Sequence, residues 1–131
     1  MTPQERADKS AKALWENDKA SHWAGFERGT VREGYAEIHL LITEHHCNGH
    51  GIGHGGVTFM LADTAFAFAC NSRNQNTVAM HNTISYIAAV RLGDRLTAKA
   101  QEVTLNGRNG IYDVLVVNQN GDTVATFRGA S

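Results

Sequence analysis

The sequence predicts an α+β domain in which a mostly antiparallel sheet wraps around one central apolar helix. The segment VTFMLADTAFAFAC, residues 57–70, is apolar on every side except for Thr58, Thr64 and Asp63, and a helix of that kind is normally buried all round. Residues 77–129 form a series of extended runs separated by turn signals. A helix and two strands precede the apolar segment, and this order fits one sheet packed around one helix, although other helix–sheet topologies fit it too.

The N-terminal elements are predicted from hydrophobic periodicity. We expect a helix over residues 4–23, ended by Gly25, and strands near 26–33 and 35–43 with a turn at Gly34. The second strand alternates apolar and polar residues. The apolar side of the helix would consist of Ala7, Ala11, Leu14, Trp15 and Trp23.

The rest of the chain follows the same reasoning. A glycine-rich loop from Glu44 to Gly55 leads into the apolar helix, which we expect from about Gly56 to Asn71. A polar segment at 72–76 breaks the chain after it. Asn-Gly pairs at 106–107 and 120–121 then supply hairpin signals. The four further strands are expected at 77–90, 94–106, 110–118 and 122–129.

Length and composition indicate one domain spanning residues 1–131. With 42% hydrophobic residues and a net charge of −1, the chain resembles neither a disordered protein nor a nucleic-acid-binding one. Its longest apolar run is shorter than the ~20 residues of a membrane span, and its charged N-terminus lacks the apolar core of a signal peptide. Cys47 and Cys70 do not suggest a disulfide framework. We therefore expect a cytoplasmic protein without nucleic-acid or membrane partners.

Asp63 is the first candidate for chemistry. An ionised carboxylate among leucine, alanine and phenylalanine is costly unless it is paired or employed, and aspartate is a poor residue in the middle of a helix. Desolvation would raise its pKa, whereas hydrogen-bond donors and the nearby helix start would lower it. If ionised, it could activate water or attack a carbonyl directly. The alternative is a buried carboxylate satisfied by backbone or hydroxyl donors.

His54, Gly55 and Gly56 stand at the entrance of the apolar helix. A free N–H at Gly55 would point toward a group docked over the helix start and could serve as an oxyanion donor. The alternative is a turn in which glycine only permits close packing. Asn48 could hold a water molecule or a carbonyl through its amide, yet Asn48-Gly49 is also a common turn pair.

The same loop is rich in histidine, which resembles a metal-binding tract. No second cluster of cysteine and histidine occurs elsewhere in the sequence, so we expect surface or hydrogen-bonding histidines and no metal. The residues of this histidine-rich tract are His45, His46, Cys47, His50 and His54. Separately, the basic residues of the strand region would suit a phosphate-bearing ligand only if they gather beside the helix entrance.

The segment N-G-H-x-x-x-H-G-G-x-x-x-x-L-A-D-T-A-F-A, from Asn48 to Ala67, resembles the acyl-CoA thioesterases of the phenylacetate pathway, which have the hotdog fold. The likeness continues through residues 70–72, 93–98, 110–114 and 124–129, so it spans nearly the whole chain. The resemblance implies a homodimer, or a homotetramer made of two dimers, that binds acyl-CoA at the dimer interface. It implies no cofactor, because coenzyme A is part of the substrate.

The resemblance also implies roles for individual residues. Asp63 would be the general base or nucleophile and would act across the interface from the subunit that supplies Asn48 and Gly55. Asn48 would orient the water or the thioester, the Gly55 N–H would polarise the carbonyl, and His54 would shape the loop. The CoA phosphates would bind two arginines near the last strands, Arg91 and Arg108.

Two features depart from the family pattern. The stretch Tyr86–Ala89 lacks the proline that the family often has before its Gly-Asp turn. The stretch Met80–Thr83 is more polar than we expect for the strand beside the acyl chamber. Both departures bear on the shape of the acyl pocket and therefore on the preferred acid.

The sequence thus predicts an enzyme that hydrolyses phenylacetyl-CoA-type thioesters, with an arylacetyl or short acyl group, to free acid and CoA. A hotdog hydratase or dehydratase that pairs His54 with Asp63 is one alternative. A non-catalytic acyl-CoA-binding module is another, although such a module has no need of a buried acid.

Overall fold

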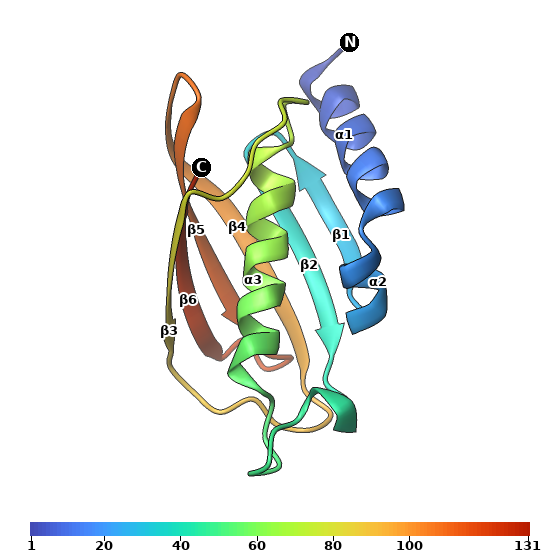
Figure 1. Ribbon diagram of the computed structural model, residues 1–131, viewed down its shortest axis with the longest axis vertical. Coiled ribbons are helices and arrows are strands. Elements are labelled where there is room, and N and C mark those ends of the chain that lie inside the picture. The colour runs from blue at the N-terminus through green and yellow to red at the C-terminus, as the bar shows by residue number, and fades with distance from the viewer.

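The computed structural model describes residues 1–131 and confirms the α+β architecture, with one antiparallel sheet wrapped around one central helix (Figure 1). The strands lie in the order β1-β2-β4-β5-β6-β3, and every neighbouring pair is antiparallel. Their bounds are β1 Glu27–Arg32, β2 Tyr35–Leu41, β3 His81–Tyr86, β4 Arg95–Asn106, β5 Asn109–Val117 and β6 Thr123–Ala130.

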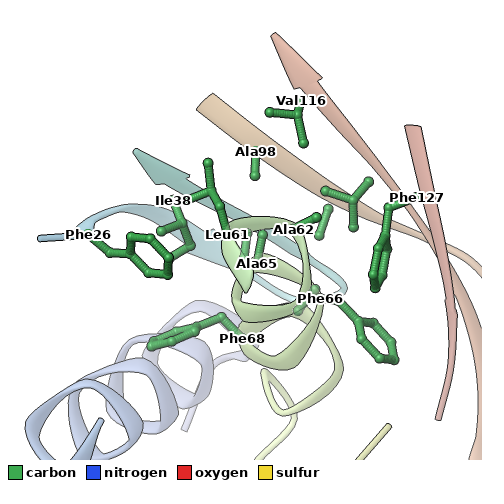
Figure 2. Packing of buried hydrophobic residues seen from close by; sticks show 14 of the residues in the cluster. Phe26, Ile38, Leu61, Ala62, Ala65, Phe66, Phe68, Ala98, Val116 and Phe127 are labelled. Carbon is green, nitrogen blue, oxygen red and sulfur yellow. The ribbon is translucent and has the colours of Figure 1, made fainter. Parts of the chain in front are cut away.

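The central helix, α3 (Gly55–Cys70), packs on the sheet through small side chains. Ala62, Ala65 and Ala69 are fully buried on its sheet-facing side, so the helix backbone can approach β2, β4 and β5 closely. Aromatic rings fill the two flanks, with Phe68 toward the N-terminal helices and Phe66 toward β6 (Figure 2). Although α3 is apolar, none of the helices is both long and apolar enough to cross a membrane.

The side of α3 that faces away from the sheet is only partly covered. We call it the open stripe; it consists of Gly56, Phe59, Met60, Asp63 and Ala67, which repeat every three or four residues. The expectation that this helix is buried all round is therefore wrong for a single chain. The physical reason is that the sheet covers one side of the helix, whereas the other side has only scattered contacts, such as Asn82 on Asp63 and Phe127 on Phe59.

The N-terminal helix expected over 4–23 is two helices, α1 (Pro3–Asn17) and α2 (Lys19–Ala24). Asp18 separates them because its side chain accepts a hydrogen bond from the Ser21 N–H at 3.0 Å and so caps the second helix. The bend turns Trp23 out of the apolar side predicted for it, and its side chain is 82% exposed.

The strand expected at 77–90 is also shorter, since β3 covers only His81–Tyr86. Before it, the chain is held by Asn71, whose amide exchanges two hydrogen bonds with the Thr77 backbone, at 2.9 and 3.0 Å. After it, the chain leaves the sheet, and the Val90 carbonyl accepts a hydrogen bond from the Gly53 N–H. The loop before α3 contains a short 3₁₀ helix, η1 (Glu44–His46).

The two edges of the sheet differ. At β1, the α1 helix packs against the strand, and Gln4 donates a hydrogen bond to the Val31 carbonyl at 2.9 Å. At the other edge, β3 pairs only with β6, so its outer backbone groups have no strand partner. Met80, Tyr86 and Ile87, at or beside this edge, are between 54% and 71% exposed. The β3 edge is therefore open to another strand.

Candidate active site

The start of α3 leaves one backbone donor free. His54 is the N-cap in an extended conformation, and its Nδ1 accepts a hydrogen bond from the Gly56 N–H at 2.8 Å. The His54 carbonyl accepts from the Val57 and Thr58 N–H groups. The Gly55 N–H donates to no protein group, as is common in the first turn of a helix. A ligand carbonyl can therefore take that position.

Gly55 also permits a close contact with Tyr86. The Tyr86 hydroxyl donates a hydrogen bond to the Gly55 carbonyl at 2.9 Å, and a Cβ at Gly55 would lie 3.2 Å from the tyrosine ring. Close packing and a free N–H thus occur at the same residue. The structural and the functional interpretations of this glycine do not exclude each other.

Asn48 and Gly55 line one cavity of about 370 Å³, which falls in the range of small-molecule sites. The Asn48 Oδ1 accepts hydrogen bonds from the His50 and Ile52 N–H groups at 2.9 and 3.4 Å, so the turn expected at Asn48 is present. Its Nδ2 group has no protein acceptor and remains available. The apolar part of the wall comes from Ile52, Ile87, Ala88, Ala89, Val90 and Val124.

Asp63 lies further along α3 on the open stripe. It is half-buried and forms no ion pair, and desolvation raises its pKa. Its one hydrogen-bond donor from the protein is the Asn82 Nδ2 on β3, at 3.2 Å from Oδ1, and this contact lowers the pKa in opposition to burial. The combination leaves a carboxylate suited to take up a proton.

Within one chain, Asp63 and Gly55 are too far apart to act on one carbonyl group. Asp63 follows Gly55 by eight residues of the same helix, which corresponds to a rise of about 12 Å along the axis. Asp63 is also absent from the wall of the cavity that Asn48 and Gly55 line. The chain therefore carries two separate groups, Asn48 with Gly55 and Asp63 with Asn82.

A second cavity, of about 410 Å³, lies between α2, η1 and α3. The exposed Trp23 ring, Val57 and Met60 form its apolar wall, together with the rings of His45 and His46. Met60 precedes Asp63 by one helical turn on the open stripe. The cavity reaches the open stripe at Met60, and Asp63 itself is not part of its wall.

The structure does not bring Arg91 and Arg108 together. Arg91 precedes β4 and forms an isolated bridge with Ile52 beside the first cavity. Arg108 follows β4 in the hairpin to β5 and lines a polar hollow with Thr77. Because they lie at opposite ends of a long strand, the two arginines of one chain cannot bind the same phosphate.

The histidines of the loop are used in hydrogen bonds. His46 is buried, with Nε2 2.7 Å from the Ala24 carbonyl and Nδ1 accepting from the Thr43 N–H at 2.9 Å. His54 caps α3. No three histidine, cysteine, aspartate or glutamate side chains gather as metal ligands would. The hydrogen-bonding role is confirmed for these two histidines, and the absence of a metal requirement stays a prediction.

Sequence reasoning did not single out Asn82 or Tyr86. Both lie on β3, and both contact α3 through pairs that are far apart in the chain. The polar stretch Met80–Thr83 was the available signal, because Asn82 occupies a half-buried position of β3 from which it contacts α3.

Residues 50–125, which include His54, Gly55 and Asp63, match the thioesterase superfamily. The chain belongs to this superfamily and is a thioester hydrolase with the hotdog fold. This confirms the family and the enzyme class that the sequence motif indicates.

Within the superfamily, the chain is similar along most of its length to PaaI proteins. The acyl-coenzyme A thioesterase PaaI of Escherichia coli is 42% identical over 126 residues, which cover 96% of this chain and 90% of that protein. The E. coli PaaI structure, from the phenylacetic acid degradation operon, has a TM-score of 0.96 at 40% identity and covers 98% of this chain and 94% of that one.

Two other structures resemble it less closely. A mutant of the phenylacetic acid degradation protein PaaI from Thermus thermophilus has a TM-score of 0.82 at 34% identity, covering 86% of this chain and 96% of that one. A hypothetical thioesterase from Streptococcus pneumoniae, with coenzyme A, has a TM-score of 0.77 at 27% identity and covers 80% of this chain and 85% of that one.

Proposed function

We propose that the protein hydrolyses acyl-CoA thioesters with an arylacetyl group, such as phenylacetyl-CoA, to the free acid and CoA. The observation that carries the proposal is the half-buried Asp63 with its raised pKa, in a thioester hydrolase whose central helix begins with a free N–H. A general base works best when its pKa lies near the working pH. The name of the E. coli relative and the coenzyme A in the pneumococcal structure support an acyl-CoA substrate.

The separation of the two groups supports a homodimer as the active unit. A second copy, with its α3 antiparallel to the first, could place the partner subunit's Asp63 beside Gly55. The β3 edge and the open stripe adjoin each other, since Asn82 of β3 contacts Asp63. Pairing of two β3 edges would continue the sheet and cover both stripes. Further assembly of two dimers into a tetramer stays a prediction.

In the proposed reaction, the thioester carbonyl accepts hydrogen bonds from the Gly55 N–H and the Asn48 Nδ2 of one subunit. The partner subunit's Asp63 takes a proton from a water molecule as the water oxygen attacks the carbonyl carbon. The resulting oxyanion is stabilised by the two donors. It then collapses with cleavage of the C–S bond, and the protonated carboxyl group returns its proton to the departing CoA thiolate.

The second cavity supports an aromatic acyl group. Its wall includes Met60, one helical turn before Asp63, and its volume of about 410 Å³ falls in the range of small-molecule sites. An exposed indole and a thioether are both favourable neighbours for an aromatic ring. We assign the aryl group of the substrate to the space between Trp23 and Met60.

The CoA phosphates remain assigned to Arg91 and Arg108 as a proposal. Arg91 lies beside the cavity of Asn48 and Gly55, so the pantetheine arm of a substrate held there could leave past it. Arg108 of the same chain is too distant to bind the same phosphate and would have to serve another subunit's site. The cytoplasmic location expected from the sequence also stays a prediction.

Replacement of the carboxylate tests the proposed function. Asp63→Asn keeps the size of the side chain but cannot accept a proton, and loss of a general base typically costs about 10²- to 10⁴-fold in rate. We expect release of free thiol from phenylacetyl-CoA to fall by that factor while the circular dichroism spectrum and CoA binding are retained. The control Asp122→Asn, at an exposed turn, should keep wild-type activity. Full activity of Asp63→Asn would refute the proposal.

Thiol release, measured together with hydration of crotonyl-CoA and with acyl-CoA binding, separates the alternative functions. A hydratase would add water to crotonyl-CoA without releasing thiol, and a binding module would bind acyl-CoA tightly without turnover. We expect neither result for the wild-type protein.

A further inference from the structure

We propose that Asn82 positions the lytic water, with its Nδ2 group holding the Asp63 carboxylate and its Oδ1 accepting a hydrogen bond from the water. This inference rests on the proposed function of Asp63. It assigns to β3 a part in the site that the helix motif does not contain.

The first observation is the contact itself. The Asn82 Nδ2 lies 3.2 Å from the Asp63 Oδ1 and is the one protein donor to that carboxylate. A carboxylate with a single fixed donor has its second oxygen free to accept a proton. Asn82 therefore sets the direction in which the free oxygen of Asp63 points.

The second observation is an unsatisfied acceptor. The Asn82 Oδ1 is buried and has no hydrogen-bond partner, and the only other buried side-chain atom in that state is the Ser10 hydroxyl in α1. A buried carbonyl oxygen without a partner is unfavourable, so such an atom in a native structure indicates a missing donor. Because Oδ1 and Nδ2 share one carbon atom, a donor to Oδ1 would lie near the Asp63 carboxylate.

One water molecule meets both requirements. It would donate one proton to the Asn82 Oδ1 and the other to the free oxygen of Asp63, which leaves a lone pair of its oxygen for attack on the thioester carbon. Asp63 then takes the water proton that is hydrogen-bonded to it. The other water proton, hydrogen-bonded to the Asn82 Oδ1, stays on the oxygen that becomes part of the acid. Asn82 is a positioning residue in this arrangement, since it exchanges no proton.

The position of Asn82 agrees with this role. It faces inward from β3 toward α3, and the other partly buried residue on that side of the strand is Ile84. An apolar side chain would fill this place without leaving a polar atom unpaired. An amide at such a half-buried position is unfavourable unless both of its polar atoms form hydrogen bonds.

Asn82→Leu tests the inference, because leucine has a similar volume and no polar atoms. We expect kcat for phenylacetyl-CoA to fall about 10- to 100-fold, as for misplacement of a reacting group, with KM changed less than about twofold. The hydrogen bond from Asn82 lowers the pKa of Asp63, so its removal raises that pKa. The acidic limb of the kcat profile should therefore move to higher pH. The shift of the limb reports loss of the contact between Asn82 and Asp63, and the fall of kcat at pH values above the limb reports misplacement of the water.

Two further variants keep the result interpretable. Asn82→Gln retains an amide and should recover part of kcat and move the acidic limb back toward its wild-type position, and it serves as the test if the leucine variant does not fold. Unchanged kcat and an unchanged acidic limb in Asn82→Leu, or a change confined to KM, would overturn the inference. If Asp63→Asn is inactive in that case, the proposed function stands and only the role of Asn82 fails. If Asp63→Asn is fully active, the proposed function fails as well.

Discussion

At Gly55 two requirements meet that can be separated by mutation. A side chain at Gly55 would crowd the Tyr86 ring, which packs against this residue. Gly55 also presents an N–H that no protein group accepts. Proline is well tolerated at the first position of a helix, and His54 before it has an extended backbone (ψ 132°) that suits a residue preceding proline. Alanine and proline at this position both add a Cβ, but only proline removes the N–H.

We therefore expect Gly55→Pro to lower kcat for phenylacetyl-CoA by about 10²- to 10³-fold relative to Gly55→Ala, the usual effect of losing one oxyanion donor. The comparison uses Gly55→Ala rather than the wild type because the alanine variant carries the same contact with Tyr86. Equal rates in the two variants would show that the N–H takes no part in the reaction.

Individual residues differ in how far the sequence predicts them. Asp63, Gly55 and His54 could be selected because each breaks a local rule of helix composition or stands at the helix start. The turn at Asn48 also follows from its glycine neighbour. Asn82 could not be selected, since its partner is on another element and a single strand position gives no sign of what it faces.

At the scale of elements, α3 and the strands β2, β4, β5 and β6 follow from hydrophobic periodicity and turn residues. The bend between α1 and α2 does not, because it depends on one side-chain cap at Asp18 within an otherwise continuous helical pattern. The end of β3 is similarly decided by tertiary contacts around Val90 and Gly53. The bend between α1 and α2 also leaves Trp23 exposed beside the second cavity.

The position of Trp23 on α2 gives a prediction about substrate choice. If the indole packs on the aryl group, Trp23→Ala should lower kcat/KM for phenylacetyl-CoA about 2- to 10-fold, which corresponds to an aromatic contact of about 0.5–1.5 kcal/mol. The value for acetyl-CoA should change less than about twofold, because acetate has no ring to lose the contact.

Val78→Ala provides the control for this prediction, because Val78 is as exposed as Trp23 and lies in another part of the chain. It should leave both kcat/KM values at the wild-type level. Equal losses for phenylacetyl-CoA and acetyl-CoA in Trp23→Ala would contradict the assignment of the second cavity.

At the scale of the whole molecule, the single chain is incomplete in three related ways. Its β3 edge has no strand partner, its open stripe is only partly covered, and the proposed base Asp63 lies about 12 Å along the helix axis from the Gly55 N–H proposed to bind the carbonyl. The sequence indicates the apolar helix but not which side of it stays open, since that depends on how far the sheet wraps. One symmetric pairing of two chains would resolve all three.

Mixed dimers test this central claim most directly. Asp63→Asn and Gly55→Pro chains with different affinity tags are co-expressed, and dimers that contain one of each are purified and assayed with phenylacetyl-CoA. If each site takes its base from one chain and its N–H from the other, one of the two sites is intact, and activity should return to about half that of wild-type dimers carrying the same tags. Mixed dimers as inactive as either parent would contradict the account.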